Sequence, residues 1–227
     1  MNNKKIKLIA ISVAMVLSTQ IVLAEDLIND FGGLTDALNK ATGASVTVNF
    51  NNNSAKTPRA VGGGAMALVA ANGNAISTTI KNSTFTNNST ESSPSYDNNG
   101  GAIYNGIKHL TISNTIFDGN KTNDGGKGGA IYNAGNISLS QTEFKQSSDT
   151  IYMANDSTAD FSDTNTLNGS ISSENATSKI KNTGTLILNA DNSGYTGTYT
   201  QESGQTDVNE SSTFFGGETT IAGGVLN

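Results

Sequence analysis

Three octamers that align on a phenylalanine constrain the fold of this chain more than any other feature. They read TTIKNSTF at 78–85, LTISNTIF at 110–117 and ISLSQTEF at 137–144. The third position is always Ile or Leu, and the second is always Thr or Ser. Such alternation is typical of a β-strand with one buried and one solvated face. We therefore expect three equivalent strands whose phenylalanines stack on one another.

A short glycine phrase precedes each octamer, at 63–65, 100–102 and 128–130. Glycine allows a tight backbone turn, and the alanine that follows leaves room for a neighbouring coil. The octamers begin 32 and then 27 residues apart, so their order is constant while the spacers vary. This is typical of a solenoid whose insertions lie in loops. Looser copies continue the pattern and predict a β-solenoid of about six or seven coils.

Two sets of residues receive structural roles in this repeat. The fifth octamer position carries an amide, for which we expect an inward ladder bonded along the axis rather than a set of ligand contacts. These amides are Asn82, Asn114 and Gln141. The residues of the repeat itself are Gly100, Gly101, Ala102, Phe117, Asn120, Gly128, Gly129, Ala130 and Phe144.

The first 24 residues have the pattern of a secretory signal peptide, with Lys4, Lys5 and Lys7 ahead of an apolar run that ends at Ala24. A membrane anchor is the alternative, but Ser and Gln within the run disfavour it. Residues 25–45 are expected to form an N-terminal cap with a short helix at 34–43. Residues 46–227 then form the β-helix. The strand pattern runs to the last residue, so we expect this domain to be incomplete at its C-terminus.

Charge and cysteine content limit the partners. Cleavage after Ala24 removes three of the 13 basic residues and none of the 19 acidic ones, which moves the net charge from −6 to −9. An acidic surface disfavours nucleic acid, which requires a basic face. With no cysteine, the chain relies on packing and hydrogen bonds, and this also suits export in an unfolded state.

The glycine phrase and the octamer end together form a recognisable motif. GGA followed by a hydrophobic residue is succeeded by F-x-x-N at 85–88 and at 117–120, whereas in the third copy Ser147 stands in place of the asparagine. This resembles the passenger repeats of polymorphic outer-membrane proteins and related autotransporter adhesins. The resemblance implies a single-stranded right-handed parallel β-helix at a bacterial surface, exported by a C-terminal β-barrel. The sequence has no barrel pattern, so we expect a translocator in cis or in trans.

The resemblance also implies an adhesin-like passenger, displayed at the cell surface or secreted, that binds a protein or glycan of a host or neighbouring cell. Tyr104, Tyr132 and Tyr152 each follow an isoleucine and are the candidate binding stripe. An equally weighted alternative is that these rings close the edge of the core. No cofactor is expected.

A polysaccharide lyase or glycoside hydrolase is the rival prediction, because such enzymes often use parallel β-helices. Their chemistry needs clustered carboxylates, and three or more in one groove would favour an enzyme. The acidic residues here are instead scattered, and His109 is the sole histidine. The acids considered are Asp97, Asp118, Asp124, Glu143, Asp160 and Asp163. Calcium binding by Asp118, Asn120 and Asp124 is disfavoured, since the spacing departs from an EF-hand loop.

Overall fold

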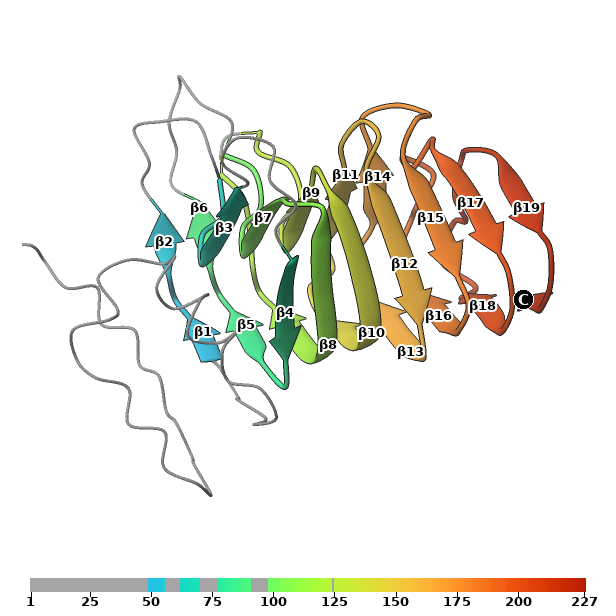
Figure 1. Ribbon diagram of the computed structural model, residues 1–227, viewed down its shortest axis with the longest axis horizontal. Coiled ribbons are helices and arrows are strands. Elements are labelled where there is room, and N and C mark those ends of the chain that lie inside the picture. The colour runs from blue at the N-terminus through green and yellow to red at the C-terminus, as the bar shows by residue number, and fades with distance from the viewer. Residues whose placement is uncertain (1–48, 56–61, 70–76, 91–97, 124) are drawn as a thin grey trace, which may run out of the picture.

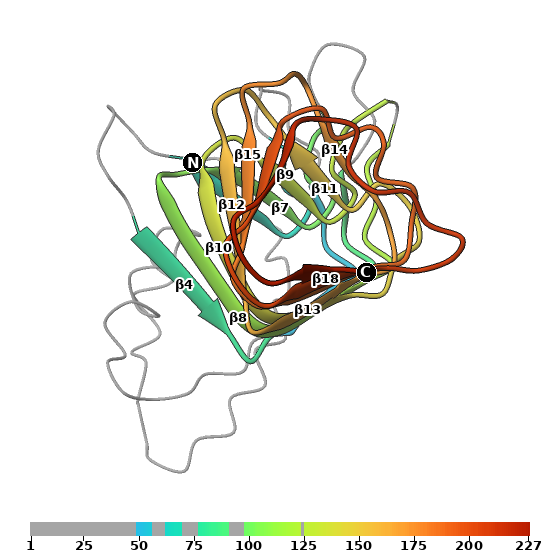
Figure 2. The same ribbon diagram turned by 90° about the vertical axis from the view of Figure 1, so that its right-hand side faces the viewer.

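Every strand pairs in parallel with the equivalent strand of a neighbouring coil in the computed structural model, which describes residues 49–55, 62–69, 77–90, 98–123 and 125–227. The described part contains strands and no helix. The coils stack along one axis in Figure 1, and Figure 2 shows three faces around a common interior. The predicted parallel β-helix is therefore confirmed. The predicted signal peptide, and the cap with its helix at 34–43, lie outside the described residues.

The front face, toward the viewer in Figure 1, is a column of seven strands in the described part of the chain. In order of stacking they are β4 (Ser77–Lys81), β8 (His109–Asp118), β10 (Asn136–Phe144), β12 (Thr158–Ser162), β15 (Lys179–Asn182), β17 (Thr198–Gln201) and β19 (Thr219–Ile221).

The lower face is a column of eight strands within the described residues, because β8 and β10 run through the corner and contribute their second halves. The others are β1 (Asn49–Asn51), β5 (Thr84–Thr86), β13 (Thr164–Leu167), β16 (Thr185–Leu188), β18 (Gln205–Val208) and β20 (Val225–Leu226). This column has one strand more than the upper value of the predicted six or seven coils, whereas the seven described strands of the front face agree with that value.

The back face consists of β3 (Met66–Val69), β7 (Ile103–Gly106), β9 (Ile131–Asn133), β11 (Ile151–Met153) and β14 (Ile171–Ser173). A small pair, β2 (Ser54–Ala55) and β6 (Ser89–Thr90), lies at the corner between the lower and back faces. No helix in the described part of the chain is both long and apolar enough to span a membrane.

The octamers align as the sequence predicts. Leu110 pairs with Thr78 on one side and with Ile137 on the other, and Phe117 pairs with Phe85 and Phe144. The three phenylalanine rings are fully buried and stack with 4.8 Å between successive centroids. Phe50 extends the stack by a fourth ring at 4.6 Å from Phe85. Leu167 and Leu188 take this place in later coils, so the core continues with aliphatic side chains.

The glycine phrase turns the chain into the back face, as expected. Gly100 and Gly128 have φ values of 71° and 70°, which glycine adopts without steric cost. A Cβ on Gly101 would lie only 2.1 Å from the Gly129 carbonyl oxygen of the next coil. Ala102 and Ala130 are fully buried, and the Ala102 amide donates to the Ala130 carbonyl at 3.0 Å. The small residues therefore permit close stacking of coils.

Candidate binding surface

The three predicted tyrosines form a continuous stack on the back face. Strand pairing places Tyr104 beside Tyr132 and Tyr132 beside Tyr152. Successive ring centroids are 5.2 and 5.3 Å apart, and the rings are inclined by 9° and 14°. Each ring therefore covers a face of its neighbour.

The tyrosine rings lie on the outer side of their strands. Ile131 and Asn133, which flank Tyr132, are both 0% exposed, so period-two alternation directs the tyrosine outward. Tyr104 and Tyr132 are half-buried, whereas Tyr152 is only 5% exposed. Tyr104 and Tyr132 are therefore partly exposed on the outer side of this face, whereas Tyr152 at the end of the stack is covered. The structure thus brings the three residues together, and their binding role stays a prediction.

A lysine lies against the Tyr152 end of the stack. Lys127 Nζ donates a hydrogen bond of 2.8 Å to the Tyr152 hydroxyl and lies 4.4 Å from the ring centroid. Next to it, the Asp149 carboxylate accepts hydrogen bonds from the Gly128 amide at 2.7 Å and from the Ser172 hydroxyl at 3.1 Å. A cation and an anion are therefore held beside the aromatic stack, in positions that sequence periodicity did not reveal.

The predicted inward ladder of Asn82, Asn114 and Gln141 is wrong in its direction. These residues have φ values of 50°, 48° and 52°, in the left-handed region, and form the bend between the front and lower faces. Asn114 and Gln141 are exposed. The Asn114 amide donates to Asn82 Oδ1 at 2.7 Å, so two of the three do bond along the axis, but on the outside. Asparagine tolerates the left-handed region better than branched residues, which explains Asn82 and Asn114 at the bend.

The inward amide ladder is formed instead by the last residue of F-x-x-N. Asn88 Nδ2 donates to Asn120 Oδ1 at 2.9 Å, and Asn53 Nδ2 donates to Asn88 Oδ1 at 2.8 Å. Asn88 and Asn120 are 0% and 1% exposed. The first member was detectable from the sequence, because Phe50-Asn51-Asn52-Asn53 is a further copy of the motif.

The third copy of F-x-x-N uses Gln146 rather than Ser147 for this position. Asn120 Nδ2 reaches Gln146 Oε1 at 3.4 Å, and Gln146 Nε2 is buried with no hydrogen-bond partner among the described residues. The inward ladder therefore weakens at this coil, where the sequence motif also departs from its pattern.

The acidic residues do not assemble a metal site in the part of the chain that the structure describes. The Asn120 amide is committed to the inward ladder and Asp118 is exposed, so these two calcium candidates do not converge. Asp97 and Asp124 lie outside the described residues. Glu143 and Asp163 do line a common depression at the front-lower corner, together with amides and threonines.

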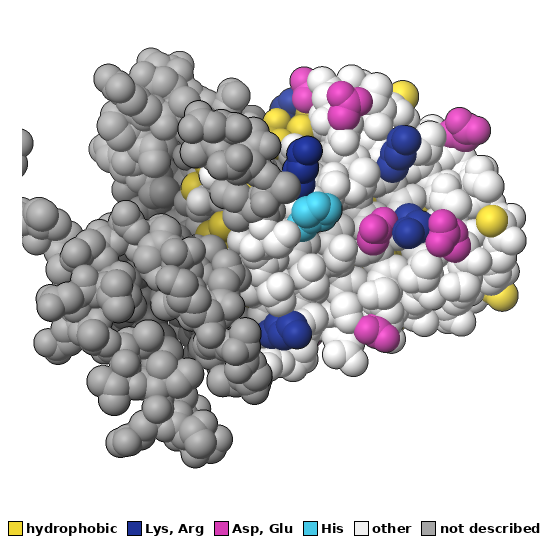
Figure 3. All heavy atoms as spheres, viewed as in Figure 1, with side chains coloured by type: hydrophobic (Ala, Val, Ile, Leu, Met, Phe, Trp, Pro, Cys, Tyr) yellow, Lys and Arg dark blue, Asp and Glu magenta, His cyan; other side chains and the backbone are white. Residues whose placement is uncertain are grey.

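The front face is polar and of mixed charge (Figure 3). Strand pairing aligns its middle outward row as Thr79, Thr111, Ser138, Asp160, Lys181, Thr200 and Thr220. Lys181 forms an ion pair of 3.8 Å with Glu202. His109 is exposed at the start of β8, with no acidic partner within the described residues. This face offers small hydroxyl groups and scattered charges.

The parallel coils, the stacked phenylalanines and the inward amides define a repeat protein of the parallel β-helix class. Two segments, 82–106 and 114–134, match the Chlamydia polymorphic membrane protein (Chlamydia_PMP) repeat. Each contains one bend, one F-x-x-N and one GGAIYN phrase. The resemblance is thus confirmed for these segments: they are repeats of the polymorphic membrane protein type, and such repeats support a surface-exposed protein of the autotransporter type. No curated protein matches the chain, and no solved structure does.

Proposed function

We propose that this chain is an adhesin-like passenger that is exported by its signal peptide and acts by binding rather than by catalysis. The observation that carries the proposal is the outward tyrosine stack of Tyr104, Tyr132 and Tyr152. Its partner is a protein or glycan on a host cell or neighbouring cell, and a β-barrel translocator in cis or in trans brings it to the surface.

The tyrosine stack has the physical properties of a binding surface. Tyrosine is enriched at protein interfaces because its ring combines apolar area with a polar hydroxyl. The rings are carried by paired strands and pack against one another, so little conformational entropy is lost on binding. Lys127 adds a cation at one end of the stack. This combination favours a partner with both apolar and hydrogen-bonding groups.

Attachment of protein-coated beads to cultured epithelial monolayers tests the proposal. Tyr132→Ala removes the middle ring and should reduce attachment about tenfold, the effect of losing an aromatic residue central to an interface. His109→Ala alters an exposed residue of the front face and is the matched control. Tyr132→Phe keeps the ring and should retain most attachment. Equal attachment by Tyr132→Ala and the unaltered chain, with both folded by circular dichroism, would refute the role of the stack.

A polysaccharide lyase or glycoside hydrolase is the second candidate, because Glu143 and Asp163 line one depression. Two carboxylates are fewer than the three that we take as the signature of such an enzyme. Incubation with neutral and acidic polysaccharides, followed by measurement of new reducing ends, separates the candidates. Turnover that Glu143→Gln abolishes would replace the adhesin proposal.

A further inference from the structure

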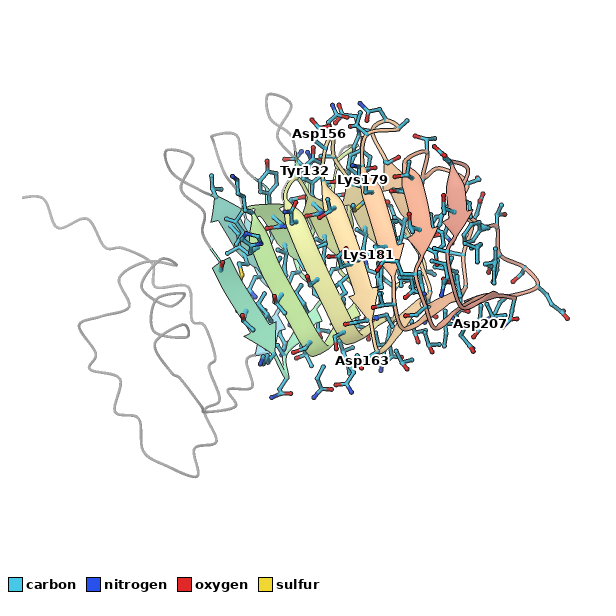
Figure 4. All side chains as sticks on the ribbon, turned by 45° about the vertical axis from the view of Figure 1, so that its right-hand side comes forward. Tyr132, Asp156, Asp163, Lys179, Lys181 and Asp207 are labelled. Carbon is cyan, nitrogen blue, oxygen red and sulfur yellow. The ribbon has the colours of Figure 1, made fainter. Side chains whose placement is uncertain are left out.

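We propose that the depression at the corner between the front and lower faces is a binding subsite for a neutral glycan chain. It is separate from the tyrosine stack. Figure 4 shows Tyr132 near the upper edge of the molecule and Asp163 near the lower edge. The subsite therefore extends the proposed function to a second surface with its own ligand chemistry.

The depression arises where the coils change shape. On one side, β10 pairs with β8 through the corner. On its other side, β10 pairs with β12 up to Ser140, opposite Ser162, and then with β13 from Glu143, opposite Thr166. Asp163, with φ of 51°, breaks the later coil between these two strands. The wall is therefore stepped at this point. The resulting depression is largely open to solvent and has a volume of about 590 Å³.

The lining of the depression is made of hydrogen-bonding groups. It includes the carboxylates of Glu143 and Asp163, the amides of Asn114 and Gln141, and the hydroxyls of Thr164 and Thr166. Such a lining matches a ligand in which every hydroxyl both donates and accepts. A carboxylate has two acceptor oxygens and suits a pair of adjacent hydroxyls.

The carboxylates are held in position without being fully used. Ser140 Oγ donates to Asp163 Oδ2 at 2.6 Å, while Asp163 Oδ1 accepts no hydrogen bond within the described residues. Glu143 Oε2 lies 3.7 Å from Lys145 Nζ, in an ion pair whose side chains are 45% and 43% exposed. The Gln141 amide also has no side-chain hydrogen bond in the described chain. Acceptors and donors therefore remain for a ligand.

The charge of the depression selects against acidic sugars. Two carboxylates are balanced by one lysine at its rim, which leaves a net negative charge that repels uronates and sialylated chains. Along the same outward row, Ile116 precedes Glu143 and Ile187 follows Thr166. Both isoleucines are half-buried and offer apolar contact to the C–H groups of sugar rings. A neutral glycan chain that lies along the axis satisfies both features.

Nuclear magnetic resonance titration of the whole chain tests the subsite. The probes are a neutral β-linked glucose hexamer and a galacturonate hexamer. The neutral hexamer should shift the amide signals of Gln141, Glu143 and Thr166, and Asp163→Asn should weaken its binding about tenfold. Asparagine tolerates the left-handed conformation, so this variant keeps the bend. Asp207→Asn, on another part of the lower face, is the matched control and should leave the affinity unchanged.

The outcomes separate this subsite from the tyrosine stack. Unshifted signals with the neutral hexamer, or equal or tighter binding of galacturonate, would overturn the subsite. Equal affinity of Asp163→Asn and Asp207→Asn would also overturn it. Loss of bead attachment in Tyr132→Ala concerns only the tyrosine stack. The glycan subsite can therefore be refuted by the titration while the adhesin proposal stands, and the adhesin proposal can be refuted by the bead assay while the glycan subsite stands.

Discussion

Replacement of Asn120 by alanine should destabilise the β-helix by about 4 kcal/mol. Asn120 is 1% exposed, and its Oδ1 accepts from the Asn88 amide at 3.0 Å and from Asn88 Nδ2 at 2.9 Å. Its Nδ2 donates to the Phe85 carbonyl at 2.8 Å. Alanine would remove one hydrogen bond from each of these three groups, although Asn88 Nδ2 keeps its bond to the Phe50 carbonyl at 2.8 Å. Each buried donor or acceptor that loses its partner costs about 1–3 kcal/mol. Relaxation of the coil and entry of water reduce the summed cost of the three lost hydrogen bonds. The expected loss of stability, about 4 kcal/mol, is therefore in the lower half of the range that three such costs span.

Urea unfolding followed by circular dichroism measures this change, and Asn136→Ala is the matched control. Asn136 lies half-buried at the start of β10, its side chain makes no hydrogen bond in the described chain, and its loss should cost less than about 0.5 kcal/mol. Coils of a solenoid can unfold in segments, so hydrogen exchange should also be measured at Asn88 and at the C-terminal coils. Faster exchange confined to the coils beside Asn120 is expected. A loss below about 1 kcal/mol for Asn120→Ala would refute the inward ladder as a major source of stability.

Three further predictions concern the core and its titration. Gly101→Ala should prevent close stacking of the coils and abolish cooperative thermal unfolding, because the added Cβ would lie 2.1 Å from the Gly129 carbonyl oxygen. The control is Gly125→Ala, whose Cβ meets no atom within 4 Å and which should lower the free energy of unfolding by only about 1 kcal/mol because of its positive φ. Phe117→Ala should cost about 3–5 kcal/mol in urea unfolding, since it removes a fully buried ring from the stack, and a loss below about 1 kcal/mol would contradict that packing. Burial raises the pKa of Tyr195 to about 12, so the unfolded chain loses the hydroxyl proton at lower pH than the folded chain, and the melting temperature should fall as pH rises from about 10 toward 12. Tyr195→Phe should make this fall shallower. An unchanged dependence of the melting temperature on pH in Tyr195→Phe would contradict the role of Tyr195.

The strand register and the phenylalanine stack were predictable because they depend on local patterns. Alternation of Leu110 and Ile112 with hydroxyl residues specifies which side of β8 is buried, and a register slip of one residue would expose that whole side. The glycine phrase was predictable for a similar reason, since few residues other than glycine fit the φ of Gly128.

The direction of the amides was not predictable from the repeat alone. Asn114 lies within β8 and Asn120 lies two residues after it, yet the first is exposed at a left-handed bend and the second is buried in a ladder. The difference depends on how sharply the chain turns at each corner. It is settled by contacts with residues about one coil away, which a single repeat does not specify.

The sequence by itself determined the repeating coil and its register, because alternation and turn chemistry act over a few neighbouring residues, and the export signal stays a prediction. Only the tertiary structure decided that the tyrosine rings face one another, that Lys127 lies beside Tyr152, and that Glu143 and Asp163 share a depression. These features join residues some 20 or more positions apart, such as Lys127 and Tyr152 at a separation of 25. The positions of these side chains depend on how each coil stacks on the next. At Asp163 this stacking changes, because the partner of β10 switches from β12 to β13.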